Sequence, residues 1–378
     1  MGSRNLKTLS RRRRTILHTE SSRGWGGQER RILAEAQTLK ARGHTLLLAC
    51  HPESQLYLRA AQAGLAVHSL PFGGRGNISA FFRLRELLRQ AKVEVLNTHS
   101  SLDSWVGTLA WKSLRHRPLL LRTRHLSTPV STHYPTRWLY HRPAAVITTS
   151  EAIKTLLQSR LKVPEDRLVS IPTGIDLREF APQPPDQTRR AALGFPPRTF
   201  LFGTVAVLRS WKGHLHLLEA TKLLLDQGAA VGLLLVGDGP YRPVIEQRLT
   251  ELALHPHVRL VGYQEDVASW LSLMDAFVFP SYANEGVPQA VVQALAMGKP
   301  VVATHIGGLP EVIIPGRTGI LTPPQDPRTL AQAMGDLLHS PEKARRFGEQ
   351  GRRLVAARYS LDHMAAALEH LYDSLSPP

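Results

Sequence analysis

Short apolar runs alternate with amphipathic segments along nearly the whole chain of 378 residues. In the first half, each run of aliphatic and β-branched residues is followed by a polar turn and then by a segment with helical spacing. This alternation predicts parallel strands joined by crossover helices, the doubly wound arrangement of the Rossmann kind. The strands expected in this half cover residues 15–18, 44–49, 67–70, 93–96, 119–122, 145–148 and 168–171.

The alternation starts afresh after residues 171–188, whose proline-rich polar end is typical of a linker. A chain of this length exceeds the size at which one hydrophobic core keeps growing. We therefore expect two α/β domains, residues 1–178 and 179–360, with residues 1–13 lacking order. The strands expected in the second half cover residues 199–208, 231–236, 258–261, 276–279 and 300–304.

Several classes of protein are disfavoured by what the sequence lacks. The apolar run at residues 231–236 is among the longest, far short of the roughly 18 residues of a membrane-spanning helix. Arg11 to Arg14 are followed by no apolar export segment, and Cys50 is the only cysteine, which fits a reducing cytoplasm. The GDGP sequence at Gly237 lacks the third glycine of a dinucleotide fingerprint, and neither a P-loop nor a zinc-binding motif occurs.

The positive charge of the chain is confined to one half. Residues 1–180 contain 29 Lys and Arg against 12 Asp and Glu, whereas residues 181–378 contain 18 of each. Such asymmetry favours an anionic partner for the first half. A nucleic-acid reader would more often show interleaved aromatic residues or a reading module, and neither is present, so we favour a membrane surface. A merely soluble basic surface is the alternative.

The stretch at residues 280–308 is typical of a ligand-binding turn, because it joins a buried strand to a helix start and then to another strand. Pro288 suits the first helical position, and the free N–H groups near residues 286–289 form a positive pole at the carboxyl end of the strand. Glu285 stands at this pole, and Gln293 lies about two turns along the helix on the same flank. These residues suit a polyhydroxylated ligand with a phosphate; a helix cap with a polar surface residue is the alternative.

Other candidate site residues also follow predicted strands. Gly26 and Gly27 open the first helix and would let the backbone approach a ligand. Arg209 and Lys212 follow a strand and could clamp a diphosphate, although solvated loop charge would explain them equally. In the first half, polar residues gather at strand ends, among them His99, Asp103, Arg124 and His125.

Taken together, the motifs resemble those of the retaining GT-B glycosyltransferases of family 4. They are IPTGID at residue 171, RSWKG at 209, GDGP at 237, PSYANEG at 280, ALAMGKPVVAT at 294 and GGLPEVI at 307, in the family's order and approximate spacing. The first half is similar more loosely, and the resemblance covers nearly the whole chain after Arg14. It implies two Rossmann-like domains facing across a cleft, the second binding a nucleotide sugar, with residues 361–378 as a helix that crosses back.

The resemblance also implies roles for particular residues. Glu285 would contact the donor sugar, Arg209 and Lys212 would clamp the diphosphate, and His125 would lie beside the transferred sugar. Two departures stand out: the family's second glutamate is Gln293 here, and Val207 occupies the position of an arginine found in many members. The remaining residues that we assign to donor binding are Gly26, Gly27, Gly237, Gly262, Tyr263, Gly286, Val287, Gln289 and Gln293, with His99, Asp103 and Arg124 as candidates on the acceptor side.

The resulting hypothesis is a retaining glycosyltransferase that needs neither metal nor cofactor. It would move a sugar from a nucleotide donor to a lipid-linked or glycan acceptor at the inner face of a membrane, in surface glycan or lipopolysaccharide biosynthesis. A GT-B-type epimerase or phosphorylase and a non-catalytic sugar-nucleotide binding module are the alternatives.

Overall fold

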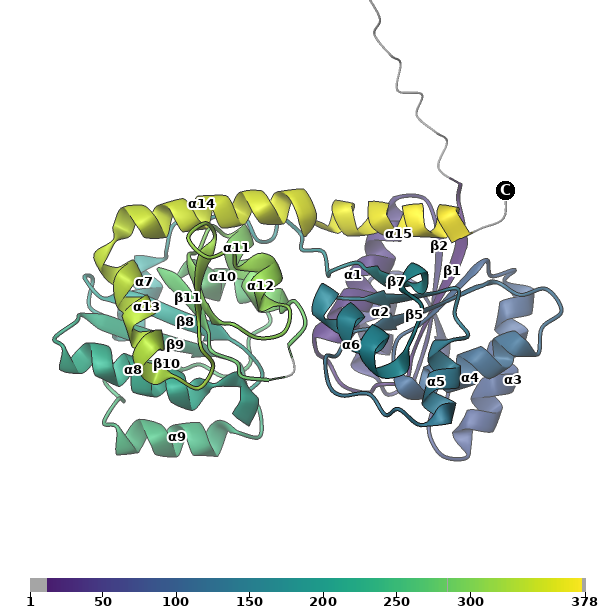
Figure 1. Ribbon diagram of the computed structural model, residues 1–378, viewed down its shortest axis with the longest axis horizontal. Coiled ribbons are helices and arrows are strands. Elements are labelled where there is room, and N and C mark those ends of the chain that lie inside the picture. Colours follow the sequence, from purple (N-terminus) through teal and green to yellow (C-terminus); the bar gives the residue numbers. More distant parts are fainter. Residues whose placement is uncertain (1–11, 284, 376–378) are drawn as a thin grey trace, which may run out of the picture. The chain divides into compact units, whose positions relative to one another are not determined.

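The computed structural model of the protein describes residues 12–283 and 285–375 (Figure 1). The expectation that residues 1–13 lack order therefore falls mostly outside the described residues. Arg12 is described, and its guanidinium lies 3.1 Å from the carboxylate of Glu94. The chain divides into two compact units: one contains the residues up to Arg124, residues 133–147 and those from Leu368 onward, and the other contains residues 125–132 and 148–367.

The first sheet has seven strands in the order β3-β2-β1-β4-β5-β6-β7, which confirms the predicted doubly wound arrangement. The order reverses at β1, so a topological switch point lies between β1 and β4. The strands are β1 (Thr15–Glu20), β2 (Thr45–Cys50), β3 (Ala66–Ser69), β4 (Val95–Thr98), β5 (Leu119–Arg124), β6 (Ala145–Thr148) and β7 (Leu168–Ser170). The helices that alternate with them are α1 (Gly27–Ala41), α2 (Gln55–Gln62), α3 (Gly76–Gln90), α4 (Ser101–Lys112), α5 (Tyr134–Tyr140) and α6 (Glu151–Leu161).

The second sheet has six strands in the order β10-β9-β8-β11-β12-β13, with its switch point between β8 and β11. Its strands are β8 (Phe200–Val205), β9 (Val231–Val236), β10 (Val258–Leu260), β11 (Ala276–Phe279), β12 (Val301–Thr304) and β13 (Gly319–Thr322). The helices are α7 (Gln187–Ala192), α8 (His214–Asp226), α9 (Arg242–Glu251), α10 (Val267–Ser272), α11 (Gln289–Ala296), α12 (Leu309–Val312), α13 (Pro327–His339), α14 (Pro341–Arg358) and α15 (Leu361–Leu375).

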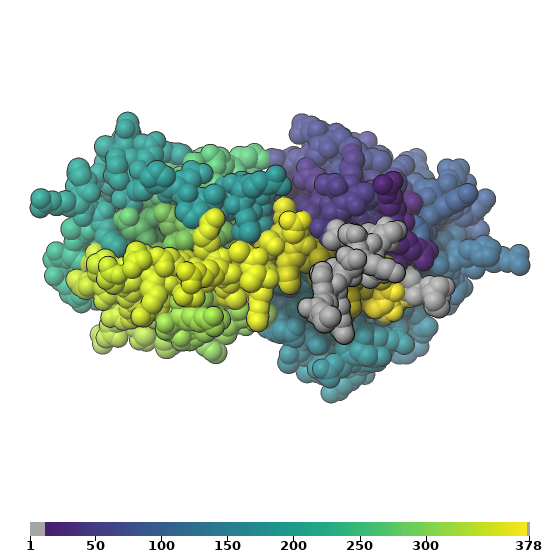
Figure 2. Space-filling view, turned by 90° about the horizontal axis from the view of Figure 1, so that it is seen from above, coloured from purple at the N-terminus to yellow at the C-terminus, as the bar shows by residue number. Residues whose placement is uncertain are grey.

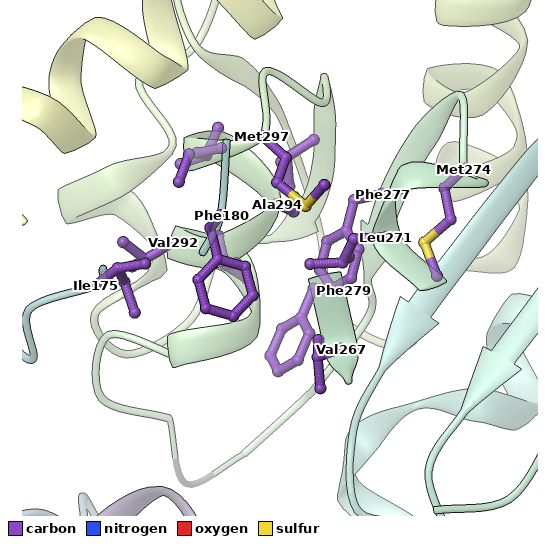
Figure 3. Packing of buried hydrophobic residues seen from close by; sticks show 14 of the residues in the cluster. Ile175, Phe180, Val267, Leu271, Met274, Phe277, Phe279, Val292, Ala294 and Met297 are labelled. Atoms are coloured by element: carbon purple, nitrogen blue, oxygen red, sulfur yellow. The ribbon is translucent and has the colours of Figure 1, made fainter. Parts of the chain in front are cut away.

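The core of the second unit forms around β11, whose four residues are all buried. Phe277 and Phe279 pack in the same cluster as Leu271 of α10 and Val292 of α11 (Figure 3). Because this strand is covered on both faces, it is apolar throughout, as parallel strands generally are. The long helix α14, yellow in Figure 2, runs over the surface of this unit.

The end of α15 belongs to the first unit and is fixed there by ion pairs. Arg42 donates through Nε and Nη2 to the two carboxylate oxygens of Glu369, at 2.9 and 2.8 Å. The buried Arg14 donates to Asp373 at 2.7 Å. Paired arginine contacts of this kind fix orientation as well as position, so residues from Leu368 onward complete the first unit. No described helix combines the length and apolar character needed to cross a bilayer.

Candidate active site

The loops that follow β8 and β11 meet at the switch point of the second sheet. Gly213 has φ of 73°, and a Cβ atom there would lie 2.0 Å from the carbonyl oxygen of Pro280. Only glycine therefore lets the two loops approach so closely. The carbonyl oxygen of Trp211 accepts the N–H of Tyr282 at 2.8 Å and the hydroxyl of Ser281 at 2.9 Å. The β8 loop is thus bonded directly onto the chain that carries Glu285.

This contact brings together Lys212 and Glu285, which lie 73 positions apart in the sequence. The ammonium Nζ of Lys212 lies 2.6 Å from Oε1 of Glu285, and the hydroxyl of Ser281 donates to the same oxygen at 2.6 Å. Glu285 is 6% exposed and Lys212 18% exposed. Among the described residues, none donates to Oε2 of Glu285, so that oxygen can accept a substrate hydroxyl. The pair joins a cation suited to phosphate with an acceptor suited to a sugar.

The loop that bears Glu285 packs against two glycines that follow β12, Gly307 and Gly308. Gly307 has φ of 50°, and a Cβ there would lie 2.0 Å from the carbonyl oxygen of Glu285. The N–H of Gly308 donates to that same carbonyl at 3.3 Å. A side chain at either glycine would displace the loop. Close contact with the backbone of the Glu285 loop therefore explains why both positions, Gly307 and Gly308, are glycine.

Helix α11 begins directly after this loop, with Pro288 at its N-cap and Gln289 as its first residue. Its first N–H groups carry the positive end of the helix dipole. Gln289 and Gln293 are four residues apart, so they share a face of the helix, and both are half-buried. The intervening Val291 and Val292 are buried in the core, so the helix is anchored by its other face.

The structure does not bring Arg209 into the Lys212–Glu285 pair. Arg209 is exposed, and its guanidinium carbon lies 5.4 Å from the centre of the Trp211 ring. Val207, at the position where many members of the resembling family have arginine, is 50% exposed. The assignments of Arg209 and Lys212 to the diphosphate both stay predictions, and of the two only Lys212 contacts Glu285.

The remaining predicted donor residues of this unit bring three loops to one edge of the sheet. Gly237 follows β9, and its N–H donates to the carbonyl of Gly262, which follows β10, at 2.8 Å. Gly237 has φ of 139°, and a Cβ there would lie 1.9 Å from the carbonyl oxygen of Ala206 after β8. Tyr263 is 52% exposed beside this junction. Gly237 is required by the close approach of the loops, Gly262 by its φ of 74°, and Tyr263 offers an aromatic ring at the edge.

In the first unit, the predicted glycine loop is tied to an acid that the sequence analysis did not single out. Glu20 ends β1, and its Oε1 accepts the N–H of Ser22 at 2.7 Å and the hydroxyl of Ser100. Its Oε2 accepts the side-chain amide of Gln28, in the first turn of α1 just after Gly26. Burial, with the nearby negative charge of Asp103 as a second cause, raises the pKa of Glu20 to about 8. An acid two residues beyond the strand predicted at residues 15–18, and shortly before GWGG, was the available signal.

Two of the predicted acceptor-side residues lie beneath this edge. Asp103 is fully buried and accepts hydrogen bonds from the hydroxyl of Thr19 at 2.8 Å and from the N–H groups of His99 and Ser100 at 2.9 and 2.8 Å. Burial raises the pKa of Asp103. The buried ring of His99 stacks on that of His18, with their nitrogens 2.9 Å apart. Both residues organise the start of α4.

Arg124 and His125 lie at the end of β5, on either side of the boundary between the two units. Both side chains are half-buried. The carbonyl oxygen of His125 accepts the hydroxyl of Thr149 at 3.4 Å, within the second unit. Their proposed roles beside the sugar and on the acceptor side stay predictions.

The sequence relatives agree with this architecture. Residues 185–354 match the family described as glycosyl transferases group 1, and residues 25–179 match glycosyltransferase family 4. The chain is 27% identical over 323 residues to a D-inositol 3-phosphate glycosyltransferase of Corynebacterium urealyticum, covering 79% of this chain and 75% of the relative. It is 29% identical to the lipopolysaccharide core biosynthesis mannosyltransferase LpcC of Rhizobium leguminosarum, covering 71% and 75%.

A solved structure supports the fold independently. The crystal structure of Anabaena Alr3699/HepE in complex with UDP-glucose superimposes with a TM-score of 0.84 at 22% identity, covering 96% of this chain and all of that one. The two Rossmann-like parallel sheets have the GT-B fold of glycosyltransferases, and the matched families are glycosyltransferases that take their sugar from a nucleotide donor. The chain belongs to the group 1 glycosyltransferases, family 4.

Proposed function

We propose that the protein catalyses retaining, metal-independent transfer of a sugar from a nucleotide donor, with Lys212 and Glu285 as its principal catalytic residues. The observation that carries this proposal is their ion pair at the β8/β11 switch point, where Nζ and Oε1 are 2.6 Å apart. Ligands of open α/β sheets bind at such points. A diphosphate entering there would offer Lys212 a more highly charged partner than the carboxylate it now contacts.

For this reaction, the site has to stabilise the negative charge that develops on the leaving diphosphate. The bond between the anomeric carbon and the phosphate oxygen breaks, the bond to the acceptor oxygen forms on the same face, and the acceptor proton passes to the leaving oxygen. Lys212 and the first N–H groups of α11 would stabilise the negative charge that develops, while Glu285 would hold a sugar hydroxyl. His125 would lie beside the transferred sugar. In this scheme the cationic groups of the chain take the place of a metal.

We further propose that the acceptor is a membrane-bound glycan or glycolipid and that the protein lies peripherally at the cytoplasmic face of a membrane. The excess of 17 positive charges in residues 1–180 supports this, because anionic leaflets attract basic surfaces. The mannosyltransferase named above acts in lipopolysaccharide core biosynthesis, which is in keeping with such a pathway. Of the acceptor-side candidates, Arg124 is half-buried and would contact the acceptor, whereas the buried His99 and Asp103 would position its surroundings.

A donor screen tests the function directly. Calorimetric titration with UDP, GDP and ADP identifies the base, and turnover is then measured with matching sugar nucleotides and a membrane lipid fraction as acceptor. The proposal expects a glycosylated product with the anomeric configuration of the donor, in the presence of a metal chelator. Release of free epimer or sugar phosphate without acceptor would identify an epimerase or phosphorylase, and binding without turnover would identify a non-catalytic module.

Substitution of Gln293 tests the assignment of α11 to the donor ribose. A glutamine offers one acceptor oxygen and an NH₂ group where a glutamate would accept from both ribose hydroxyls. We expect Gln293→Ala to weaken binding of the preferred nucleoside diphosphate by roughly 1 to 3 kcal/mol, because ribose hydroxyls would lose their partner. Gln293→Glu should change it by no more than about 1.5 kcal/mol, since the added negative charge near the diphosphate offsets stronger bonds.

Calorimetry of the wild type and the two Gln293 variants decides this point. Gln247→Ala, on α9, serves as a control, because among the described residues its side chain bonds only to Glu251 on the same helix. Unchanged affinity in Gln293→Ala would show that this face of α11 does not reach the ribose.

A further inference from the structure

Helix α3 exposes two large apolar side chains in the middle of a stripe of arginines. Ile78 is 68% exposed and Phe82 is 62% exposed. Arg75, Arg85 and Arg89 continue the same stripe, because spacings of three and four residues place side chains on one side of a helix. The stripe is apolar at its centre and cationic at both ends.

The other side of α3 is already packed. Ala80, Leu84 and Leu88 are buried in the core of the first unit. The exposed apolar side chains are therefore not needed to attach the helix. Burying a side chain of this size is worth roughly 1.5 to 3 kcal/mol, so two adjacent ones in water leave a considerable driving force unused.

Neighbouring helices of the same unit also expose apolar or aromatic side chains. Helix α4 packs along α3, as Figure 1 shows, and exposes Leu109, which is 46% accessible. Trp105, one turn earlier on α4, stacks on Trp138 of α5 with ring centres 5.6 Å apart. Tyr134, one turn before Trp138, is 79% exposed. Tryptophan and tyrosine have an apolar body with a polar tip, the combination that suits the boundary between lipid and water.

Most arginines of α3 have no carboxylate partner, unlike those of α9. Among the described residues, no acid pairs with Arg75, Arg83 or Arg85, whereas Arg89 lies 3.1 Å from Glu86, the only acid between residues 75 and 92. By contrast, α9 exposes Val244 while its arginines are all engaged, Arg242 with Glu246 and Arg248 with Glu219 and Glu251. The positive charge of α3 is thus available to an external anion.

We propose that this face, defined by Arg75, Ile78, Phe82, Arg85 and Arg89 of α3, docks on an anionic phospholipid leaflet. The helix would lie in the plane of the interface, with Ile78 and Phe82 among the upper acyl carbons and the arginines at the headgroup phosphates. The inference rests on the proposed transfer to a membrane-bound acceptor and identifies the surface by which the enzyme reaches it. A symmetric dimer through the same face would instead bring unpaired arginines against each other, which disfavours it.

Vesicle sedimentation of the full-length protein tests the proposal. Wild type should bind vesicles that contain phosphatidylglycerol, bind pure phosphatidylcholine vesicles far less, and be released as salt rises. The double change Ile78→Ser and Phe82→Ser should weaken partitioning by at least about tenfold, because apolar insertion is lost while the charge is kept. The triple change of Arg75, Arg85 and Arg89 to Gln should weaken it on the order of a hundredfold, at roughly fivefold for each arginine. Val244→Ser on α9 is the matched control and should bind as wild type.

A fluorescent label locates the inserted side chain. Cys50 is fully buried, and burial raises the pKa of its thiol to about 12, so it is protected from labelling. A polarity-sensitive dye attached through Phe82→Cys should shift to the blue and brighten on phosphatidylglycerol vesicles. The same dye attached through Val244→Cys should not change.

Three results would overturn the proposal. They are equal binding of the double serine variant and wild type, an unshifted dye at position 82 on bound protein, and a change of oligomeric state in the double serine variant by analytical ultracentrifugation with vesicle binding unaffected. The first two would leave only charge attraction, and the third would identify a second copy of the chain as the occupant. Donor binding and turnover on a water-soluble acceptor should be unchanged in the α3 variants, so failure of this inference is distinguishable from failure of the proposed transfer.

Discussion

Replacing Lys212 with alanine should lower turnover at saturating donor by about a hundredfold or more, the usual cost of removing a preorganised charge stabiliser from an active site. The physical reason is that the diphosphate leaves with negative charge that Lys212 neutralises. Glu285→Ala should have a comparable effect through the donor sugar and through the position of Lys212, since the two side chains are 2.6 Å apart. Steady-state kinetics with the preferred donor give the measurement.

The matched control for this experiment is Lys222→Ala. Lys222 lies on α8, the helix that follows the Lys212 turn, and pairs with the exposed Asp226. The Lys222→Ala change removes the same charge without altering the switch point, so turnover should stay near that of the wild type. Near-normal turnover in Lys212→Ala would show that this lysine does not act on the departing diphosphate. Circular dichroism of both variants checks that the fold is kept.

Glu20→Gln should change how the stability of the protein depends on pH. In the folded protein the pKa of Glu20 is raised to about 8, from 4.5 in the unfolded chain, because the carboxyl group is buried beside Asp103. Its stabilising contribution is complete below about 4.5 and is lost as the pH rises through about 8, because only the folded state keeps the proton in between. The loss amounts to about 1.4 kcal/mol per pH unit over this window.

A glutamine is neutral at every pH and similar in shape, so the variant should lose this dependence. Urea unfolding at pH 5 and pH 9 should show a larger fall in the free energy of unfolding for wild type than for Glu20→Gln. Glu53→Gln, which removes an exposed carboxylate paired with Arg23, is the control and should keep the wild-type slope. Identical slopes in wild type and Glu20→Gln would mean that Glu20 is ionised in the folded protein. The glycine loop would then be held by a carboxylate rather than by a carboxylic acid.

The sequence predicts the bounds of an element best where the hydrophobic pattern and the flanking turn residues indicate the same start and end. Residues 231–236 and 276–279 were predicted as strands with the bounds that β9 and β11 have, because both are uninterrupted apolar runs between turn residues. Helix α11 begins within one residue of the expected position, since Pro288 marks its start. Local chemistry therefore sufficed for the elements around the switch point.

Elements with weaker patterns were missed or misplaced. The short strand β13 was not predicted, because Gly319–Thr322 offers only two aliphatic residues. Helix α3 begins at Gly76 although Gly76, Asn77 and Ser79 are poor helix formers, because tertiary packing holds them in place. Such positions are decided by contacts that no local pattern contains.

In the candidate site, too, local patterns identify individual residues, whereas the contacts between them depend on tertiary packing. Lys212 and Glu285 were predicted separately, each from the end of its own strand, but their ion pair depends on the closeness of the two loops that Gly213 permits. The guanidinium of Arg209 lies over the ring of Trp211 and not at the Lys212–Glu285 pair. No pattern in the sequence indicates this contact. Glu20 escaped notice because its raised pKa comes from burial, which a single sequence does not reveal.

The return of the C-terminal segment to the first unit has a consequence for biosynthesis. Arg14 and Asp373 are separated by 359 positions, and Arg42 and Glu369 by 327. At about 5 to 20 residues per second, a ribosome needs on the order of tens of seconds to pass from one partner to the other. During that time the buried Arg14 lacks its carboxylate and the first unit lacks a helix. The part of the enzyme that is made first is therefore among the last to finish folding, and it depends on chaperones or on its own partial stability until the final turns of α15 leave the ribosome.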